Sequence, residues 1–121
     1  MNFFLIIEIL AALIITRGIL INILYKFGSY FSEKEEFQKS LSIFKFLNIV
    51  NPNDYIVLDC LGDTFFDLKE YHSAIKFYKK SLIKFSNNPE TNKNLARAYL
   101  ALSEWNEASY FFAAGNSLKR G

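Results

Sequence analysis

The sequence predicts an all-α protein made of stacked helical hairpins, and three observations support this fold class. Helix-like apolar periodicity fills most of the 121 residues, and only two of them are proline. A pattern of small and large residues recurs every 34 positions, as it does in helical repeat proteins. The first 25 residues are strongly hydrophobic and run into the first repeat without a turn signal.

The 34-residue period is clearest around a short motif that surrounds a small residue. In the middle unit this motif is Leu58-x-x-Leu61-Gly62-x-x-Phe65. Glycine inside a helix costs about 1 kcal/mol relative to alanine, so a packing reason must offset the cost. We therefore expect the small residues to lie where the two helices of each unit cross. They are Gly28, Gly62 and Ala96 in the first helices, and Ser40, Ala74 and Ala108 in the second helices.

This pattern resembles the tetratricopeptide repeat, a 34-residue helix–turn–helix unit with small residues at fixed places and a proline near its end. The resemblance covers about residues 21–116, in units of about 21–54, 55–88 and 89–116, with 117–121 as a short basic tail. It implies a right-handed superhelical stack of three hairpins. We expect helices at about 3–33, 36–49, 54–68, 71–85, 89–102 and 105–117. Asn53 or Asp54, and Asn88, are expected as N-caps.

Residues 1–25 are predicted to form a hydrophobic anchor helix, since a bilayer span needs about 20 mainly apolar residues. Glu8 and Arg17 are the charged residues of this segment. We expect one continuous helix from about Phe3 to about Glu33, with residues 3–25 crossing the membrane once. No basic residue precedes the apolar core, whereas Arg17 and Lys26 follow it. The positive-inside tendency therefore places the repeats on the cytoplasmic, or plastid stromal, side.

Two other interpretations of this segment stay open. The helix could pack against a protein inside a membrane complex, with Glu8 or Arg17 paired there, because intramembrane charges are functional candidates by default. It could also be a soluble helix that packs on the repeat stack. A cleaved signal peptide is disfavoured, because the start of the chain is not basic and the first repeat begins inside the segment.

The sequence contains no constellation typical of an enzyme. There is one histidine, His72, and one cysteine, Cys60, which do not make a zinc site. The five glycines are dispersed rather than gathered in a phosphate-binding loop. A net charge of +2, with both signs mixed, gives no reason to expect nucleic acid. We expect no catalytic residues, no metal and no cofactor.

The resemblance implies binding of a peptide or partner helix in a concave groove lined by the first helix of each unit. The residues projected into this groove are Ser29, Glu33, Asp59, Asp63, Phe66, Asp67, Lys93, Arg97 and Leu100. The aspartates form an acidic strip beside a basic strip of Lys93 and Arg97. The two strips could form ion pairs between neighbouring helices, which would contribute little to stability, or they could select a partner of complementary charge.

Some proteins with this repeat grip a C-terminal carboxylate with Lys, Asn and Arg side chains. The matching places here hold Tyr25, Ser29, Cys60, Glu90 and Asn94, so that clamp is not expected. At the other end of the stack, one helix cannot bury all three of the consecutive aromatics Tyr110, Phe111 and Phe112. Either the stack is only marginally stable at that end, or a second protein contact covers it.

The expected function is a non-enzymatic scaffold or assembly factor that holds a partner protein at a membrane. Small membrane-anchored proteins with three such repeats include assembly factors for photosynthetic complexes in plastids and cyanobacteria. Because this chain has a similar layout, we expect that it could serve in the biogenesis of a membrane complex such as a photosystem. Two alternatives are a soluble adaptor or chaperone, whose N-terminal helix packs on the stack or covers a client, and a permanent structural subunit of a membrane complex.

Overall fold

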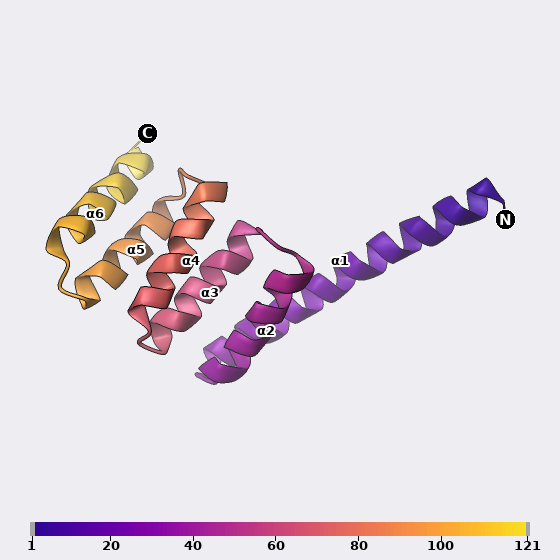
Figure 1. Ribbon diagram of the computed structural model, residues 1–121, viewed down its shortest axis with the longest axis horizontal. Helices are drawn as coiled ribbons and strands as arrows, with labels where there is room; N and C mark the ends of the chain where they lie inside the picture. Colours follow the sequence, from indigo (N-terminus) through magenta and orange to yellow (C-terminus); the bar gives the residue numbers. More distant parts are fainter. Residues whose placement is uncertain (1, 121) are drawn as a thin grey trace.

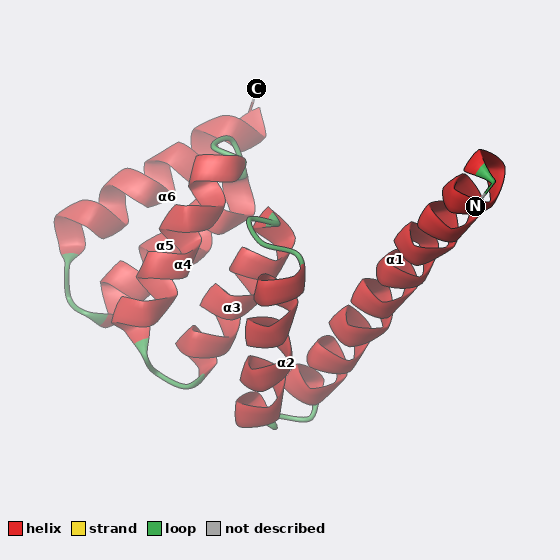
Figure 2. Cartoon of the chain, turned by 45° about the vertical axis from the view of Figure 1, so that its right-hand side comes forward, coloured by secondary structure: helices red, strands yellow, loops and turns green. Residues whose placement is uncertain are grey.

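The computed structural model describes residues 2–120, and all of the regular structure in them is helical (Figure 1). The six helices are α1 (Phe3–Glu33), α2 (Phe37–Val50), α3 (Tyr55–Asp67), α4 (Tyr71–Lys84), α5 (Pro89–Ala101) and α6 (Trp105–Arg120). They form three antiparallel hairpins, which stack through α2 against α3 and through α4 against α5 (Figure 2). The expected all-α stack is confirmed.

The helix ends lie close to those expected from the sequence, because local signals set them. Asp54 and Asn88 are the N-caps of α3 and α5, and their side chains accept hydrogen bonds from the backbone N–H groups of Ile56 and Glu90. One end differs. Helix α6 continues to Arg120, so most of the expected tail 117–121 is its last turn.

The turn inside each hairpin repeats with the same 34-residue period. Glu35, Lys69 and Ser103 all adopt left-handed backbone conformations, with φ between 59° and 61°. The next N–H group in each turn reaches back to the carbonyl of the residue five positions earlier, as Glu70 N does to Phe65 O at 2.8 Å. These left-handed caps close the first helix of each unit and turn the chain sharply into the second.

Close approach of the two helices within a hairpin depends on glycine at two crossings. A Cβ atom on Gly28 would lie 2.7 Å from Phe44 Cζ, and one on Gly62 would lie 2.5 Å from Tyr78 Cε1. Both aromatic rings are buried. Ser40 also lies at the first crossing, where its hydroxyl donates to the Gly28 carbonyl at 3.0 Å. Ala74, Ala96 and Ala108 are buried as well. The helix cost of glycine is thus offset by ring packing.

Helix α1 is unbroken and extends well beyond the stack (Figure 1). By length and composition it could cross a membrane, and the most apolar 18-residue window of the helix has no buried residue. Helix α1 contacts the stack at Arg17, whose guanidinium donates a hydrogen bond to the carbonyl of Val50 at the end of α2. Ile21, Leu24 and Tyr25 then pack on the core. The N-terminal part of α1 therefore does not pack on the repeats.

Candidate partner-binding groove

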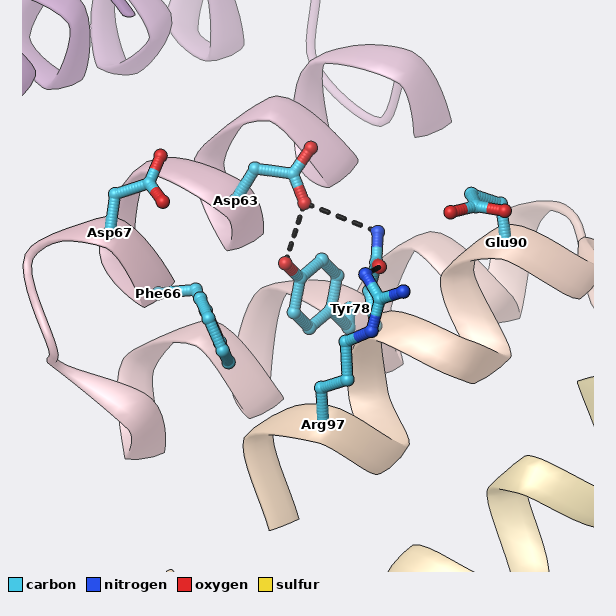
Figure 3. Close-up of a pocket in the computed structure, with 7 residues that line it drawn as sticks. Asp63, Phe66, Asp67, Tyr78, Glu90 and Arg97 are labelled. Atoms are coloured by element: carbon cyan, nitrogen blue, oxygen red, sulfur yellow. Dashed lines mark hydrogen bonds between the residues drawn. The ribbon is translucent and has the colours of Figure 1, made fainter. Parts of the chain in front are cut away.

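A pocket of about 400 Å³ opens between α3 and α5, and its floor is the α4 residue Tyr78 (Figure 3). Helix α3 presents its side chains from one face, because positions i, i+3 and i+4 lie on the same side of a helix. The lining residues are Asp63, Phe66 and Asp67 from α3, Tyr78 from α4, and Glu90, Asn94 and Arg97 from α5. Four of the groove residues expected from the sequence therefore meet in one pocket.

A chain of hydrogen bonds crosses the pocket from α4 through α3 to α5 (Figure 3). The Tyr78 hydroxyl donates to Asp63 Oδ1 at 2.6 Å, and Asn94 Nδ2 donates to the same oxygen at 3.3 Å. Arg97 Nη1 in turn donates to Asn94 Oδ1 at 3.3 Å. Arg97 is thus held by an amide rather than by a carboxylate of α3, and its charge stays available to a ligand.

The electrostatics of the pocket centre on Asp63. Solvent reaches this side chain, but the surrounding protein limits hydration of the carboxylate, and this desolvation raises the pKa of Asp63 to about 6. The hydrogen bond from Tyr78 lowers the pKa of Asp63, because it favours the ionised form. The nearby carboxylates of Asp59 and Asp67 raise the pKa further. Desolvation also raises the pKa of Asp67. The pocket is therefore an acidic surface, and its negative charge increases as the pH rises from mildly acidic to neutral.

A second, smaller pocket of about 270 Å³ continues the groove toward α1. Ser29 and Glu33 line it from α1, together with Cys60 and Asp63 from α3. Because Asp63 borders both pockets, they form one concave surface that runs across α1, α3 and α5. This surface is called the groove below, and its members are Ser29, Glu33, Cys60, Asp63, Phe66, Asp67, Tyr78, Glu90, Asn94 and Arg97.

Three residues that the sequence projected into the groove line neither of these pockets. Asp59 instead joins two units, since Asp59 Oδ2 accepts from Thr91 Oγ1 at 2.8 Å and from Asn88 Nδ2 at 3.3 Å. Burial raises the pKa of this carboxyl. The stem of Lys93 runs close to Gly115 of α6, and Leu100 is partly exposed near the end of α5.

The most important groove residue that the sequence analysis missed is Tyr78. It lies one 34-residue period from both Phe44 and Phe112, and an aromatic residue at each of these equivalent positions predicts packing alone. The usable signal was the hydroxyl group, which neither of the other two aromatics has and which needs a partner when the ring is buried. Asn94 stands at a place that a carboxylate clamp would use, and the sequence gives no other reason to expect it in the groove.

The C-terminal aromatic run divides between core and surface. Phe111 stacks on Tyr99 with ring centroids 5.7 Å apart, and Phe112 is half-buried. Tyr110 remains 68% exposed, so it is the residue of this run that offers a further contact. Within residues 2–120, no group of three or more His, Cys, Asp or Glu side chains could hold a metal ion.

Solved structures share this architecture. A MamA structure (AMB-1) matches with a TM-score of 0.78 at 20% identity over 84% of this chain and 60% of that chain. PcrH, solved in complex with the chaperone-binding region of PopB, matches with a TM-score of 0.79 at 21% identity, over 82% of this chain and 80% of that one. The fold is a tetratricopeptide-like helical repeat stack.

A third match extends the comparison to a peptide complex. The first tetratricopeptide domain of Spaghetti (RPAP3), bound to the HSP90 peptide SRMEEVD, matches with a TM-score of 0.79 at 13% identity, over 84% of this chain and 80% of that one. This chain spans about 60% of the length of the MamA protein that it matches. No protein-family model matches the sequence, and no curated protein matches it. Because the sequence identities are low, these matches establish the tetratricopeptide-like fold alone.

Proposed function

We propose that this chain is a non-enzymatic scaffold that holds a partner protein at a membrane through its tetratricopeptide-like groove. The observation that carries the proposal is the continuity of α1. One unbroken helix, which by length and composition could cross a bilayer, carries an exposed apolar segment at its N-terminal end and the first wall of the groove at its C-terminal end. A partner in the groove would therefore be held at the membrane surface without an intervening flexible linker.

The chemistry of the groove favours a ligand with a basic side chain. Asp63, Asp67 and Glu90 surround the larger pocket, and Phe66 adds an apolar wall. Arg97 at the border would pair with an acidic residue of the same ligand. PcrH and RPAP3 were solved with segments of partner proteins, which supports the same class of ligand here. A peptide that ends in a carboxylate fits less well, since Cys60 and Glu90 stand where the clamp would need basic or amide groups.

The membrane part of the proposal can be tested by fractionation with a carbonate wash. The full chain should stay with the membrane, whereas a version that starts at Ile15 should be soluble and helical. That starting point keeps the contact between Arg17 and Val50, so a loss of membrane binding would not reflect a damaged stack. Recovery of the full chain in the soluble fraction would favour the soluble adaptor.

The groove can be tested with a photo-crosslinking residue at position 63 or 97 in membranes of the native host. The matched control carries the same residue at Lys80, which is exposed on α4 and lies outside the groove. Crosslinks to one protein from positions 63 and 97, lost with Asp67→Lys, would support the proposal. Equal crosslinking from position 80 would contradict it. Participation in assembly of a membrane complex, such as a photosystem, is the finer form of the proposal and would be read from the partner's identity.

A second candidate, a permanent subunit of a membrane complex, is favoured by the placement of Glu8. Helical geometry puts Glu8 on the same face as Ile15, Ile19 and Lys26, and all four are exposed. Ile21 and Gly28 face the stack from the opposite side. An anionic side chain at membrane depth favours a partner helix with a cation. If the chain is such a subunit, Glu8→Leu should release it from the complex while leaving it in the membrane.

A further inference from the structure

The edge of the stack beside α1 is formed by the connections between successive units. It comprises residues 49–55, at the turn from α2 to α3, and residues 83–88, at the turn from α4 to α5. We call this surface the inter-repeat edge. Helix α1 passes it at Arg17, whose guanidinium donates to the carbonyl of Val50. Because α1 is one unbroken helix, the edge is fixed in orientation relative to the apolar segment that projects past it (Figure 1).

The inter-repeat edge carries exposed apolar side chains at equivalent positions of two units. Ile49 is 75% exposed and Ile83 is 78% exposed, and the two positions are one 34-residue period apart in the last turns of α2 and α4. Tyr55 and Phe85 lie on the same edge, with ring centroids 5.1 Å apart and both rings partly open to solvent. Scattered exposed isoleucines need no explanation, but repetition at one edge, beside an aromatic pair, does.

The polar residues of this edge are also of a particular kind. Most of them are uncharged hydrogen-bonding residues that lie between the apolar side chains, namely Asn51, Asn53, Ser86, Asn87 and Asn88. The two charged residues are Asp54, a partly buried N-cap, and Lys84, which is exposed. The opposite edge, made by the turns inside the hairpins, carries mostly charged residues. These are Glu33, Lys34, Glu35, Glu36, Lys69, Glu70 and Glu104. Aromatic rings, aliphatic side chains and a lysine at one level are the usual composition of a protein surface at the membrane interface.

We propose that the inter-repeat edge lies in the headgroup region of the membrane into which the apolar segment of α1 inserts, with Ile49, Ile83 and the Tyr55–Phe85 pair at the boundary of the acyl chains. The inference rests on the proposed membrane anchoring and adds a second, peripheral contact to it. Lipid is the occupant that the geometry favours, because the anchor leaves the stack past this edge. With the edge on the membrane, Glu90 at the start of α5 lies nearer the membrane than Asp67 at the end of α3.

Fluorescence quenching in vesicles of the full chain tests this inference, and the protein provides its own control. Trp105 is the single tryptophan, is 65% exposed and begins α6 at the opposite edge. Two further proteins carry Trp105→Phe together with Ile83→Trp or Phe85→Trp, substitutions at exposed sites that should leave the fold intact. Each protein is reconstituted in vesicles of phosphatidylcholine and phosphatidylglycerol, with and without bromine on the acyl chains near the headgroup.

We expect bromine to quench the tryptophans introduced at positions 83 and 85 by about twofold or more, and Trp105 hardly at all, because the interface is only a few residues deep. Equal quenching of all three positions, or none at the edge, would overturn the inference while leaving the anchor intact. Edge tryptophans protected from aqueous iodide but not quenched by bromine would show that protein covers the edge, which also overturns it. A chain that does not float with the vesicles would overturn the anchoring and this inference together.

Discussion

The ring of Tyr78 lies against Gly62 so closely that a Cβ atom at position 62 would stand 2.5 Å from Tyr78 Cε1. The hydroxyl of the same ring donates to Asp63, the neighbour of that glycine, at 2.6 Å. One side chain thus closes the helix crossing of the middle unit and fixes the central carboxylate of the groove. In the first unit, Phe44 packs on Gly28 in the same way but has no hydroxyl to place a polar group.

Gly62→Ala should destabilise the stack by about 1–3 kcal/mol, the usual cost of overpacking a buried site. The new methyl group would collide with a ring that is 1% exposed and has little room to move. Urea unfolding followed by circular dichroism measures the change. The control is Gly18→Ala, where nothing lies within 4 Å of the added atom. That substitution should be neutral, or stabilising by up to about 1 kcal/mol through helix propensity. Similar losses at both positions would contradict the packing role of Gly62.

Tyr78→Phe should raise the pKa of Asp63 further above its value of about 6, because the lost hydrogen bond favours the ionised carboxylate. Near pH 8 the substitution should cost about 1.5–3 kcal/mol, the range for a hydrogen bond to a charged group. Carbon-13 NMR titration of the aspartate side chains reports the pKa directly. Tyr110→Phe, which removes an exposed hydroxyl, is the control and should leave the titration unchanged. An unaltered Asp63 titration in Tyr78→Phe would mean that the hydrogen bond does not tune this group.

Asp63→Asn should change how stability depends on pH. The pKa of Asp63 is raised in the folded state, so the folded protein binds more protons than the unfolded chain. The stabilising contribution of the protonated form is complete below about pH 4 and is lost as the pH rises through about 6. Asparagine does not ionise, so the variant does not lose this contribution. Its stability relative to the natural protein should therefore increase as the pH rises from about 4 through about 6. The gain should be about 1 kcal/mol, because solvent screens part of the effect.

Thermal unfolding at several pH values checks this expectation. Asparagine keeps an oxygen that can accept from Tyr78, so the two proteins should have similar melting temperatures near pH 4 and diverge by pH 7. A variant that is less stable by the same amount at all pH values would contradict the expectation, because it would show that ionisation of Asp63 does not change the stability of the fold.

Lys69→Gly should stabilise the protein by up to about 1 kcal/mol. Lys69 has a φ of 61°, a left-handed conformation that is strained for any residue with a Cβ atom and free of strain for glycine. Part of the gain is offset by the greater freedom of glycine in the unfolded chain. Lys80→Gly, in the middle of α4, is the matched control and should destabilise by about 1 kcal/mol. Chemical denaturation of both variants distinguishes them, and two losses of equal size would refute the argument.

Cys60 should react slowly with thiol reagents although it borders the groove. Burial raises the pKa of its thiol to about 12, so very little reactive thiolate is present near pH 8. We expect labelling of the folded protein to be at least about tenfold slower than labelling in urea, where the pKa returns to about 8.5. Mass spectrometry over a time course gives both rates. Equal rates in the folded and unfolded protein would show that the thiol is neither desolvated nor shielded.

Much of the architecture could be predicted from the sequence because its signals are local. The 34-residue spacing of Gly28, Gly62 and Ala96 indicated three equivalent hairpins, and the caps at Asp54 and Asn88 placed two helix starts. The absence of a turn signal before Leu24 indicated one continuous α1. Each of these features depends on residues a few positions apart or on a repeated unit, so it can be recognised without knowledge of distances across the fold.

The groove illustrates what the sequence alone could not determine. Spacing placed Asp59 and Asp63 on one face of α3, but only tertiary packing turned Asp59 toward α5 and left Asp63 in the pocket. In the same way, the partner of Arg97 is Asn94 rather than an aspartate. Short-range periodicity encodes the repeats, the helices and the apolar segment, so these features could be predicted from the sequence. Which side chains meet depends on the crossing geometry of the helices, and no local pattern specifies that geometry.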